Sequence, residues 1–452
     1  MNSLKAPATT GLVQLGRDLR AGKVTSTSLV QARLERIQEL EPRLQAFTHL
    51  DAQRALAHAQ AMDQLMSSGV DLGPLMGIPV AVKDLFSIKG TPTTAGSRVD
   101  IQDLVPPPGR FVQALFRSGC VLLGKTRTTE FALGGFNPSH VLPWNPCDEK
   151  VKRMTGGSSH GSAVAMAAGL AGFTVGSDTG GSVRWPAALC GVVGYKASAT
   201  HWPTDGVFPL SPHMDSVGIF TQSVQDAACI EAALAGRTLA SPPPVSGLRL
   251  AWPVRHFMEN LDASVAACFE AALQRLRQAG AKITEIDVPE AAEIDAVFRC
   301  LVPADLLAFL GRERIQRCAD QIDPVAASRL AAANDLKADE YVRMVSRRAA
   351  LEQLMRERFG DFDAWISPTV PQIPPPIDNF KAVSDIAEWN RLATQNTRPG
   401  NLFNQCGISI PIHHLGADLP VGLQLCAPSS CDAELLQAAM ALEALLGPAA
   451  NA

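Results

Sequence analysis

The first part of the chain shows a helical spacing of apolar residues. Between residues 11 and 68, apolar side chains recur every three or four positions, which is the periodicity of amphipathic helices. The pattern predicts three helices. Thr25 or Ser26 is expected to cap the second, since a hydroxyl just before the run LVQARLERIQEL can accept a backbone N–H. The third covers AQRALAHAQAMDQLM and ends near Gly69.

After this helical part, short apolar runs alternate with helical segments. GIPVAVKDLF is short and rich in β-branched residues, which predicts a buried strand. FVQALFRSGCVLLGKTRT predicts a helix, a turn and a strand. Residues 262–288 repeat this unit, with Asp262 opening the helix and KITEIDVP as the strand. Such alternation is typical of an α/β protein with a mostly parallel sheet.

Two proline-rich segments interrupt the pattern. They are SPPPVSG at 241–247 and SPTVPQIPPPI at 367–377. At roughly 150 residues per domain, a chain of 452 residues could hold about three domains. Both segments are short, however, so they are interpreted as loops within one compact unit.

Composition excludes several classes of protein. Hydrophobic residues make up 46% of the chain and charged residues 19%, as in folded globular proteins. Forty Lys and Arg against 44 Asp and Glu offer no basic surface for nucleic acid or anionic lipid. The longest apolar stretch, 163–175, is too short for a membrane span, and the first residues lack the apolar core of a signal peptide. Ten scattered cysteines without zinc spacing indicate the reduced thiols of a cytoplasmic protein.

Glycine is concentrated in one segment. Ten of the 39 residues from 156 to 194 are glycine. Two loops, GGSS at 156–159 and DTGGS at 178–182, flank a predicted helix at about 162–171. A serine in such a loop lies beside backbone N–H groups, the arrangement that acyl transfer requires. A phosphate-binding loop or close helix packing would also explain the glycines, but GxGxxG is absent and no lysine follows the second loop.

Serine chemistry also needs a base, and Lys83 is the candidate. No GxSxG motif occurs, and none of the nine histidines pairs with an acid at a familiar spacing. Lys83 follows a strand-like apolar run, where burial would lower the pKa of its amine and allow it to act as a base. The alternative is a lysine whose charged end reaches solvent from the end of the strand.

Three motifs together resemble the amidase signature family. They are GIPVAVKD, GGSSHGS and GSDTGGSVRWPAALCGVVGYK. The resemblance extends over nearly the whole chain, through the N-terminal helices, GKTRTTEFA and LPVGLQL. It implies the amidase-signature fold, an α/β fold whose large, mixed, mostly parallel twisted sheet is covered by helices on both faces. It also implies a single amidase domain of residues 1–452, with an N-terminal helical part (1–70) packed on the core and a signature core at about 75–200.

The resemblance also implies a Ser–cis-Ser–Lys triad. Ser182 would be the nucleophile, and Ser158, which follows a cis peptide bond after Gly157, would relay its proton. Lys83, neutral in the resting enzyme, would be the base, as in other serine–lysine hydrolases. Ser159 would support the lysine by hydrogen bonding.

Further residues receive roles by the same resemblance. The backbone N–H groups of the second loop, from Thr179, Gly180, Gly181 and Ser182, would form the oxyanion hole. Asp178 and Arg184 are assigned to the architecture of that loop.

Other residues are candidates for the substrate pocket. Candidate substrate-binding residues are Phe136, Met154 and Gly157, with Trp144 and residues 208–215 as further candidates. Lys152 and Arg153 would either bind an acidic substrate or remain solvated. Cys190 and Cys406 are interpreted as buried packing residues.

The chain also departs from the family pattern. His160 and Thr155 replace a usual glycine and proline, and GYKA at 194–197 replaces GLKP. His160 would either pack at the start of a helix or contact substrate.

The expected activity is hydrolysis of a carboxamide, urea-like or carbamoyl C–N bond through an acyl-enzyme on Ser182. The expected partner is a small-molecule amide, with no metal or other cofactor, no direct nucleic-acid contact and no membrane, and a homodimer is possible. The alternative is the ammonia-releasing, amidase-like subunit of a glutamine-dependent glutamyl-tRNA amidotransferase.

Overall fold

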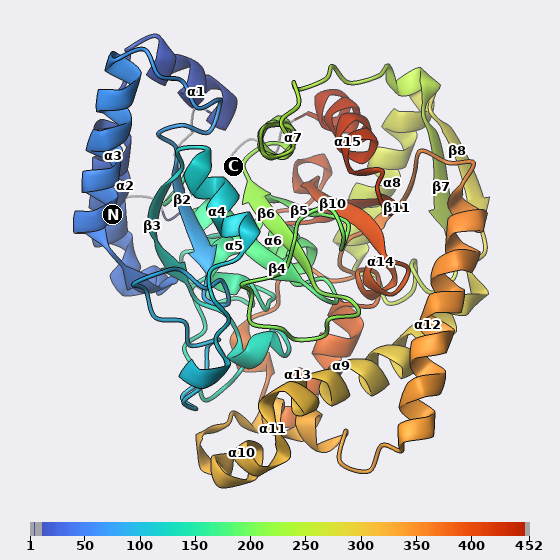
Figure 1. Ribbon diagram of the computed structural model, residues 1–452. Coiled ribbons are helices and arrows are strands. Elements are labelled where there is room, and N and C mark those ends of the chain that lie inside the picture. Colours follow the sequence, from blue (N-terminus) through green and yellow to red (C-terminus); the bar gives the residue numbers. More distant parts are fainter. Residues whose placement is uncertain (1–3, 5–10, 448–452) are drawn as a thin grey trace.

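One large sheet forms the centre of the molecule. The computed structural model describes residue 4 and residues 11–447, and within them eleven strands join in the order β1-β3-β2-β4-β6-β5-β10-β11-β9-β7-β8 (Figure 1). The strands are β1 (Phe47–Leu50), β2 (Pro79–Lys83), β3 (Val121–Thr126), β4 (Phe173–Asp178), β5 (Val193–Lys196), β6 (Ser216–Thr221), β7 (Arg249–Pro253), β8 (Lys282–Ile286), β9 (Ala364–Pro368), β10 (Gln405–Pro411) and β11 (Gly422–Pro428).

Helices pack around this sheet. They are α1 (Leu12–Arg20), α2 (Ser26–Leu44), α3 (Ala52–Ser67), α4 (Arg110–Arg117), α5 (His160–Ala167), α6 (Arg184–Cys190), α7 (Val224–Leu234), α8 (Ala263–Gln278), α9 (Ile294–Leu310), α10 (Arg312–Arg317), α11 (Pro324–Ala331), α12 (Ala338–Phe359), α13 (Val383–Ala393), α14 (Arg398–Leu402) and α15 (Asp432–Leu446). Among the described residues, no helix combines the length and the apolar character that crossing a bilayer would require.

Both faces of the sheet are buried. Successive side chains of a strand point to opposite faces, and in β2 Val80 and Val82 join one apolar cluster while Ala81 joins another. The first cluster includes residues of α7, α8 and α15, and the second includes residues of α2, α3 and α5. The predicted α/β fold with helices on both faces is therefore confirmed.

The sheet is mixed, but the prediction that it is mostly parallel is wrong. β2 pairs in parallel with β3 and β4, and β7 with β8 and β9, whereas the other six neighbouring pairs are antiparallel. The prediction rested on helix-to-strand units, which do give parallel pairs at β2–β3 and β7–β8. The central strands β5 and β6, and β10 and β11, follow each other without an intervening α-helix, so each pair runs antiparallel.

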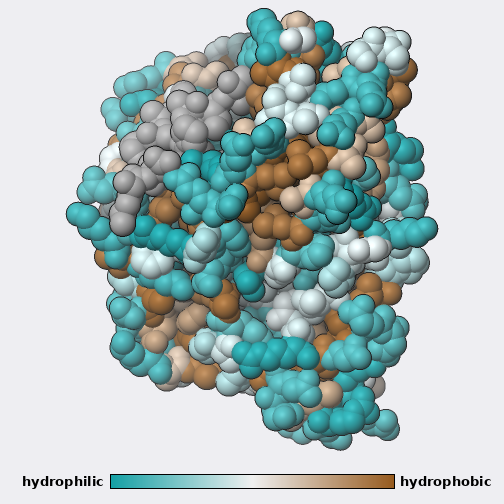
Figure 2. All heavy atoms as spheres, turned by 90° about the vertical axis from the view of Figure 1, so that its left-hand side faces the viewer, coloured by the Kyte–Doolittle hydropathy of each residue, from teal (hydrophilic) through white to brown (hydrophobic). Residues whose placement is uncertain are grey.

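The N-terminal helices lie along one edge of the sheet (Figure 1). Thr25 caps α2 as predicted, since its side chain accepts the Ser28 N–H and the Ser28 hydroxyl accepts the Thr25 N–H. The sequence pattern missed β1, which lies between α2 and α3 and pairs with β3. The side of the molecule facing the viewer in Figure 2 is mainly hydrophilic, with hydrophobic patches. Exposed apolar residues at and after the end of α3 include Leu65, Val70 and Leu72.

The two proline-rich segments lie outside the α-helices and strands, apart from the end of β9 at 364–368. That the whole chain forms one domain stays a prediction.

Close packing of α6 on β5 positions the glycine-rich segment. A Cβ atom on Gly194 of β5 would lie 2.4 Å from Ala187 Cβ and 3.0 Å from the Val183 carbonyl oxygen. A methyl group at this position would therefore push α6, which directly follows Ser182 and Val183, away from the sheet.

We expect Gly194→Ala to lower the free energy of unfolding by about 1–3 kcal/mol, the usual cost of overpacking a buried contact. Thermal melting followed by circular dichroism would measure the change. Gly247→Ala is the matched control, because a Cβ there meets nothing within 4 Å. Equal melting temperatures for the two variants would contradict this account of the packing.

Candidate active site

Two parallel strands bring the candidate residues to one edge of the sheet. β2 and β4 are parallel neighbours, with Val82 opposite Val175. Their carboxyl ends therefore meet, which places Lys83 beside Ser177. The turn after β4 carries Ser182, and the loop before α5 carries Ser158.

Lys83 is fully buried and contacts two serines. Its Nζ lies 2.6 Å from Ser158 Oγ and 2.9 Å from Ser177 Oγ. Burial lowers the pKa of this amine to about 7, although the negative charges of Asp178 and Asp215 oppose the shift. A large fraction of Lys83 is therefore neutral near pH 7 and able to accept a proton.

Ser158 lies in a loop that is fixed on both sides. The peptide bond between Gly157 and Ser158 is cis, as the family resemblance implies. The Thr129 N–H donates to the Ser158 carbonyl at 3.2 Å. The Ser159 N–H donates to the Ser182 carbonyl at 3.3 Å, which ties this loop to the turn carrying Ser182. Within the described residues, Ser182 Oγ forms no hydrogen bond, and it lies half-buried at the edge of a pocket.

Ser159 does not contact Lys83, contrary to expectation. Its hydroxyl donates to the Ser177 carbonyl at 3.1 Å and accepts the Ser177 N–H at 3.3 Å. Ser159 thus holds Ser177, and Ser177 is the residue that contacts the lysine. The sequence did contain a signal: Ser177 is a polar residue near the carboxyl end of a buried strand, as Lys83 is.

A buried ion pair shapes the turn that carries Ser182. Arg184 Nη2 lies 3.0 Å from Asp178 Oδ1. Burial alone would raise the pKa of Asp178, but Arg184 and the hydrogen bonds of the site hold it well below its usual range. The carboxylate also accepts the backbone N–H groups of Gly181, Val183 and Arg184, at 2.8, 3.1 and 3.3 Å. The architectural role predicted for Asp178 and Arg184 agrees with these contacts.

The contacts of Asp178 also reduce the number of backbone N–H groups in this turn that are free to bind an oxyanion. Because the Gly181 N–H donates to Asp178, it is already engaged. The N–H groups of Thr179, Gly180 and Ser182 donate to no group in the described part of the chain. Three of the four predicted oxyanion donors are therefore available.

Residues from distant segments pack so closely against this turn that two of its positions have no room for a side chain. A Cβ on Gly180 would lie 2.6 Å from the Phe298 ring, and a Cβ on Gly181 would lie 2.1 Å from Thr397 Oγ1. Gly181 also has a φ of +120°, which L side chains rarely adopt. Both positions therefore require glycine for packing.

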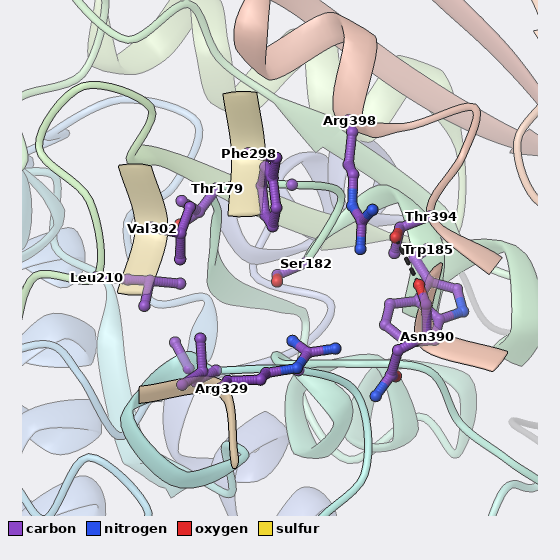
Figure 3. A pocket seen from close by; sticks show the side chains of 14 residues that line it. Thr179, Ser182, Trp185, Leu210, Phe298, Val302, Arg329, Asn390, Thr394 and Arg398 are labelled. Atoms are coloured by element: carbon purple, nitrogen blue, oxygen red, sulfur yellow. Dashed lines mark hydrogen bonds between the residues drawn. The ribbon is translucent and has the colours of Figure 1, made fainter. Parts of the chain in front are cut away.

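Ser182 opens into a pocket walled by distant parts of the chain. Figure 3 shows side chains from the turn after β4 and from the C-terminal half pointing into the same space. The lining residues are Ala132, Leu133, Gly134, Thr179, Gly180, Ser182, Trp185, Leu210, Phe298, Val302, Arg329, Asn390, Thr394 and Arg398. Leu210 lies within the candidate stretch 208–215 predicted from the sequence, but no motif indicates the residues from Phe298 onward.

The predicted substrate-binding residues Phe136, Met154 and Gly157 do not line this pocket. Met154 is fully buried in an apolar cluster with Trp185, and Phe136 packs against that cluster. Gly157 faces Gly135, since a Cβ there would lie 2.8 Å from Gly135 Cα.

The other candidate residues, Trp144, Arg153 and His160, contact the protein itself or lie outside the pocket. Trp144 lies beneath the Arg43 guanidinium, and Arg153 pairs with Asp148 at 2.8 Å. His160 is the first residue of α5, and burial lowers its pKa to about 3. It does not line the pocket, which fits packing at a helix start.

The two cysteines named from the sequence are buried, as predicted. Cys190 and Cys406 are buried, which raises the pKa of both thiols well above the usual range. Across the described residues, no three His, Cys, Asp or Glu side chains gather as metal ligands would.

Comparison with known proteins identifies the family. The sequence profile of the Amidase family matches residues 28–436. The chain is 38% identical over 440 residues to 2-amino-5-chloromuconic acid deaminase of Comamonas testosteroni, covering 95% of this chain and 94% of that protein. It is 33% identical to a subunit of the glutamyl-tRNA(Gln) amidotransferase of Salinispora arenicola, covering 99% of this chain and 98% of that protein.

Solved structures agree with the sequence relatives. The crystal structure of an amidase matches with a TM-score of 0.87 at 30% identity, covering 97% of this chain and 100% of that one. The peptide amidase of Stenotrophomonas maltophilia matches with a TM-score of 0.80 at 26% identity, covering 97% of each chain. The chain therefore belongs to the Amidase family, and it is an amide-hydrolysing enzyme.

Proposed function

We propose that this enzyme cleaves a carboxamide or carbamoyl-type C–N bond through a covalent acyl-enzyme on Ser182, with Lys83 as the base and Ser158 as the proton relay. The observation that carries the proposal is the buried contact of 2.6 Å between Lys83 Nζ and Ser158 Oγ. A lysine is a useful base only when it is neutral, and burial supplies that condition here.

The proposed reaction has the following steps, and the contact between Lys83 Nζ and Ser158 Oγ supports the transfer to the base. Ser182 Oγ attacks the carbonyl carbon, its proton passes to Ser158, and the Ser158 proton passes to Lys83. The N–H groups of Thr179, Gly180 and Ser182 stabilise the negative oxygen that forms. Lys83 then returns the proton through Ser158 to the departing nitrogen, and the C–N bond breaks. Water then attacks the ester on Ser182 and gives a proton through Ser158 to Lys83, and Lys83 returns a proton through Ser158 to Ser182 Oγ as the acid leaves.

The amidotransferase alternative is less well supported. The glutamyl-tRNA(Gln) amidotransferase subunits match at 33% identity or less among the relatives compared, against 38% for the deaminase. The hydrolysis of a small amide by the isolated chain is therefore the function we propose. Ammonia release that occurred only in the presence of a partner protein would favour the alternative.

We also propose that the enzyme works in the cytoplasm and without a cofactor. Its ten cysteines form no disulfide within the described residues, which is usual for proteins of reducing compartments. A homodimer remains a proposal from the family resemblance.

Replacing the nucleophile or the base should abolish most activity. We expect Ser182→Ala to lower kcat/KM by a factor on the order of 10⁴ or more, since the acyl-enzyme can no longer form. Lys83→Met should cost about 10²–10⁴, the usual contribution of a general base. Release of ammonia from a panel of amides would be measured, with melting temperatures to show that each variant is folded. A folded Ser182→Ala enzyme with full activity would exclude the proposed mechanism.

Activity should also rise with pH. Because the pKa of Lys83 lies at about 7, the amine is protonated and inactive below that pH and neutral above it. We therefore expect kcat/KM to rise about tenfold per pH unit below pH 7 and to level off above it, since this ratio reports the ionisation of the free enzyme. A flat profile from about pH 6 to 10, with chemistry shown to be rate-limiting, would contradict the role of Lys83.

A further inference from the structure

Two arginines share the pocket with Ser182. Arg329 comes from α11 and Arg398 is the first residue of α14. Figure 3 shows both guanidinium groups pointing into the space beside Ser182, from opposite sides. Two positive charges that point into one small pocket repel each other. An anion bound between them would relieve this repulsion.

Arg329 has no partner in the described structure. Its side chain forms no hydrogen bond and no ion pair with any described residue, although Asp295 lies near enough to raise its pKa. Burial has the larger effect and lowers that pKa to about 10, so the guanidinium stays positively charged at neutral pH. Arg329 is half-buried, and a cation partly removed from water without a counterion is costly. A bound anion would reduce this cost.

Asn390 offers a second donor at the same place. Its Oδ1 accepts the Gly135 N–H at 3.2 Å, and its Nδ2 is buried without a hydrogen-bond partner among the described residues. A Cβ built on Gly134 would lie 3.2 Å from Arg329 Nη1 and 3.6 Å from Asn390 Nδ2. Both donor groups thus converge beside Gly134, on the wall of the pocket. A planar group with two acceptor oxygens matches such a pair of donors.

Arg398 is only partly neutralised. Its Nη1 lies 2.7 Å from Asp295 Oδ1, and its guanidinium stacks on the Phe298 ring at 4.6 Å. Asp295 is shared with Arg299, at 3.0 Å, and the Nε of Arg398 is buried without a partner in the described part of the chain. Asp295 therefore divides its charge between Arg398 and Arg299 and acts on Arg329 only from a distance. This leaves the pocket with an excess of positive charge.

The rest of the pocket limits the size and polarity of the ligand. Apolar side chains supply much of the wall, among them Leu133, Leu210, Phe298 and Val302. The pocket is small, which suits a short ligand rather than a long one. A short hydrocarbon chain fits these walls, with its charged end at the arginines.

We propose that the substrate is a short amide that also carries a carboxylate, such as the monoamide of a short dicarboxylic acid. Arg329 and Asn390 bind the carboxylate, Arg398 adds positive charge from the opposite wall, and Ser182 attacks the amide carbonyl at the other end. This inference rests on the proposed function, since it takes Ser182 as the reacting residue. Arg329 and Asn390 are then the residues that determine specificity.

Paired substrates test the proposal. Succinamic, glutaramic and adipamic acids would be compared with their methyl esters, which have the same amide but no negative charge. We expect the wild-type enzyme to prefer the acids, and Arg329→Gln to lower kcat/KM for the acids by about 10- to 100-fold, as for loss of a hydrogen bond to a charged group. The esters should change less than threefold. Arg329→Lys should retain part of the preference, and Arg343→Gln, an exposed arginine paired with Asp339, should retain all of it.

A binding measurement separates this inference from the proposed mechanism. The Ser182→Ala enzyme would be melted with succinate, glutarate or adipate, and with sulfate at equal ionic strength. A rise in melting temperature with a dicarboxylate, absent with sulfate and absent when Arg329→Gln is added, supports the inference even if Ser182 is not the nucleophile. Equal hydrolysis of acids and esters by the wild-type enzyme, or equal effects of sulfate and dicarboxylates, would overturn it while leaving the acyl-enzyme mechanism intact.

Discussion

The buried ion pair between Asp178 and Arg184 connects the parts of the molecule that form the site. Arg184 also donates to Gln424 of β11 at 2.8 Å and to Asn401 of α14 at 2.7 Å, while Asp178 holds three N–H groups of the turn. Each charge therefore has a partner and further hydrogen bonds, which is the condition under which a charge can be buried. Loss of either partner would leave an unpaired charge in the core and release the turn around Ser182.

Burial has a different consequence for Lys83, whose amine contacts no carboxylate of the described residues. Its two contacts are neutral hydroxyls, from Ser158 and Ser177. Charges of Asp178 and Asp215 act from farther away and only moderate the effect of desolvation. One edge of the sheet thus holds a charged, paired cation at Arg184 and an amine close to neutrality at Lys83. Both side chains are fully buried, but Arg184 has the more basic group and a carboxylate partner, whereas Lys83 contacts only hydroxyls.

Short motifs encode the parts of the site that could be predicted from the sequence. Lys83, Ser158 and Ser182 lie in such motifs, and the structure brings them to one edge of the sheet. Ser177 was missed because its contact with Lys83 depends on the register of β4 against β2. Arg329 and Asn390 were missed because they reach the pocket through the packing of α11 and α13, which no local pattern reveals. The excess of parallel strands was predicted because helix-to-strand units are conspicuous, whereas the antiparallel centre has no comparable signal.

The contacts of Gly180 and Gly181 have a consequence for how the chain is organised. Phe298 and Thr397, which press against these glycines, come from segments more than a hundred residues beyond the turn. The signature stretch at about 75–200 therefore lacks some of the residues that pack against the turn around Ser182. The packing of this turn is complete only when the last third of the polypeptide is present. During synthesis, Ser182, the proposed nucleophile, would emerge well before the segments that hold its turn in place, so catalytic competence would be acquired late, by the whole chain.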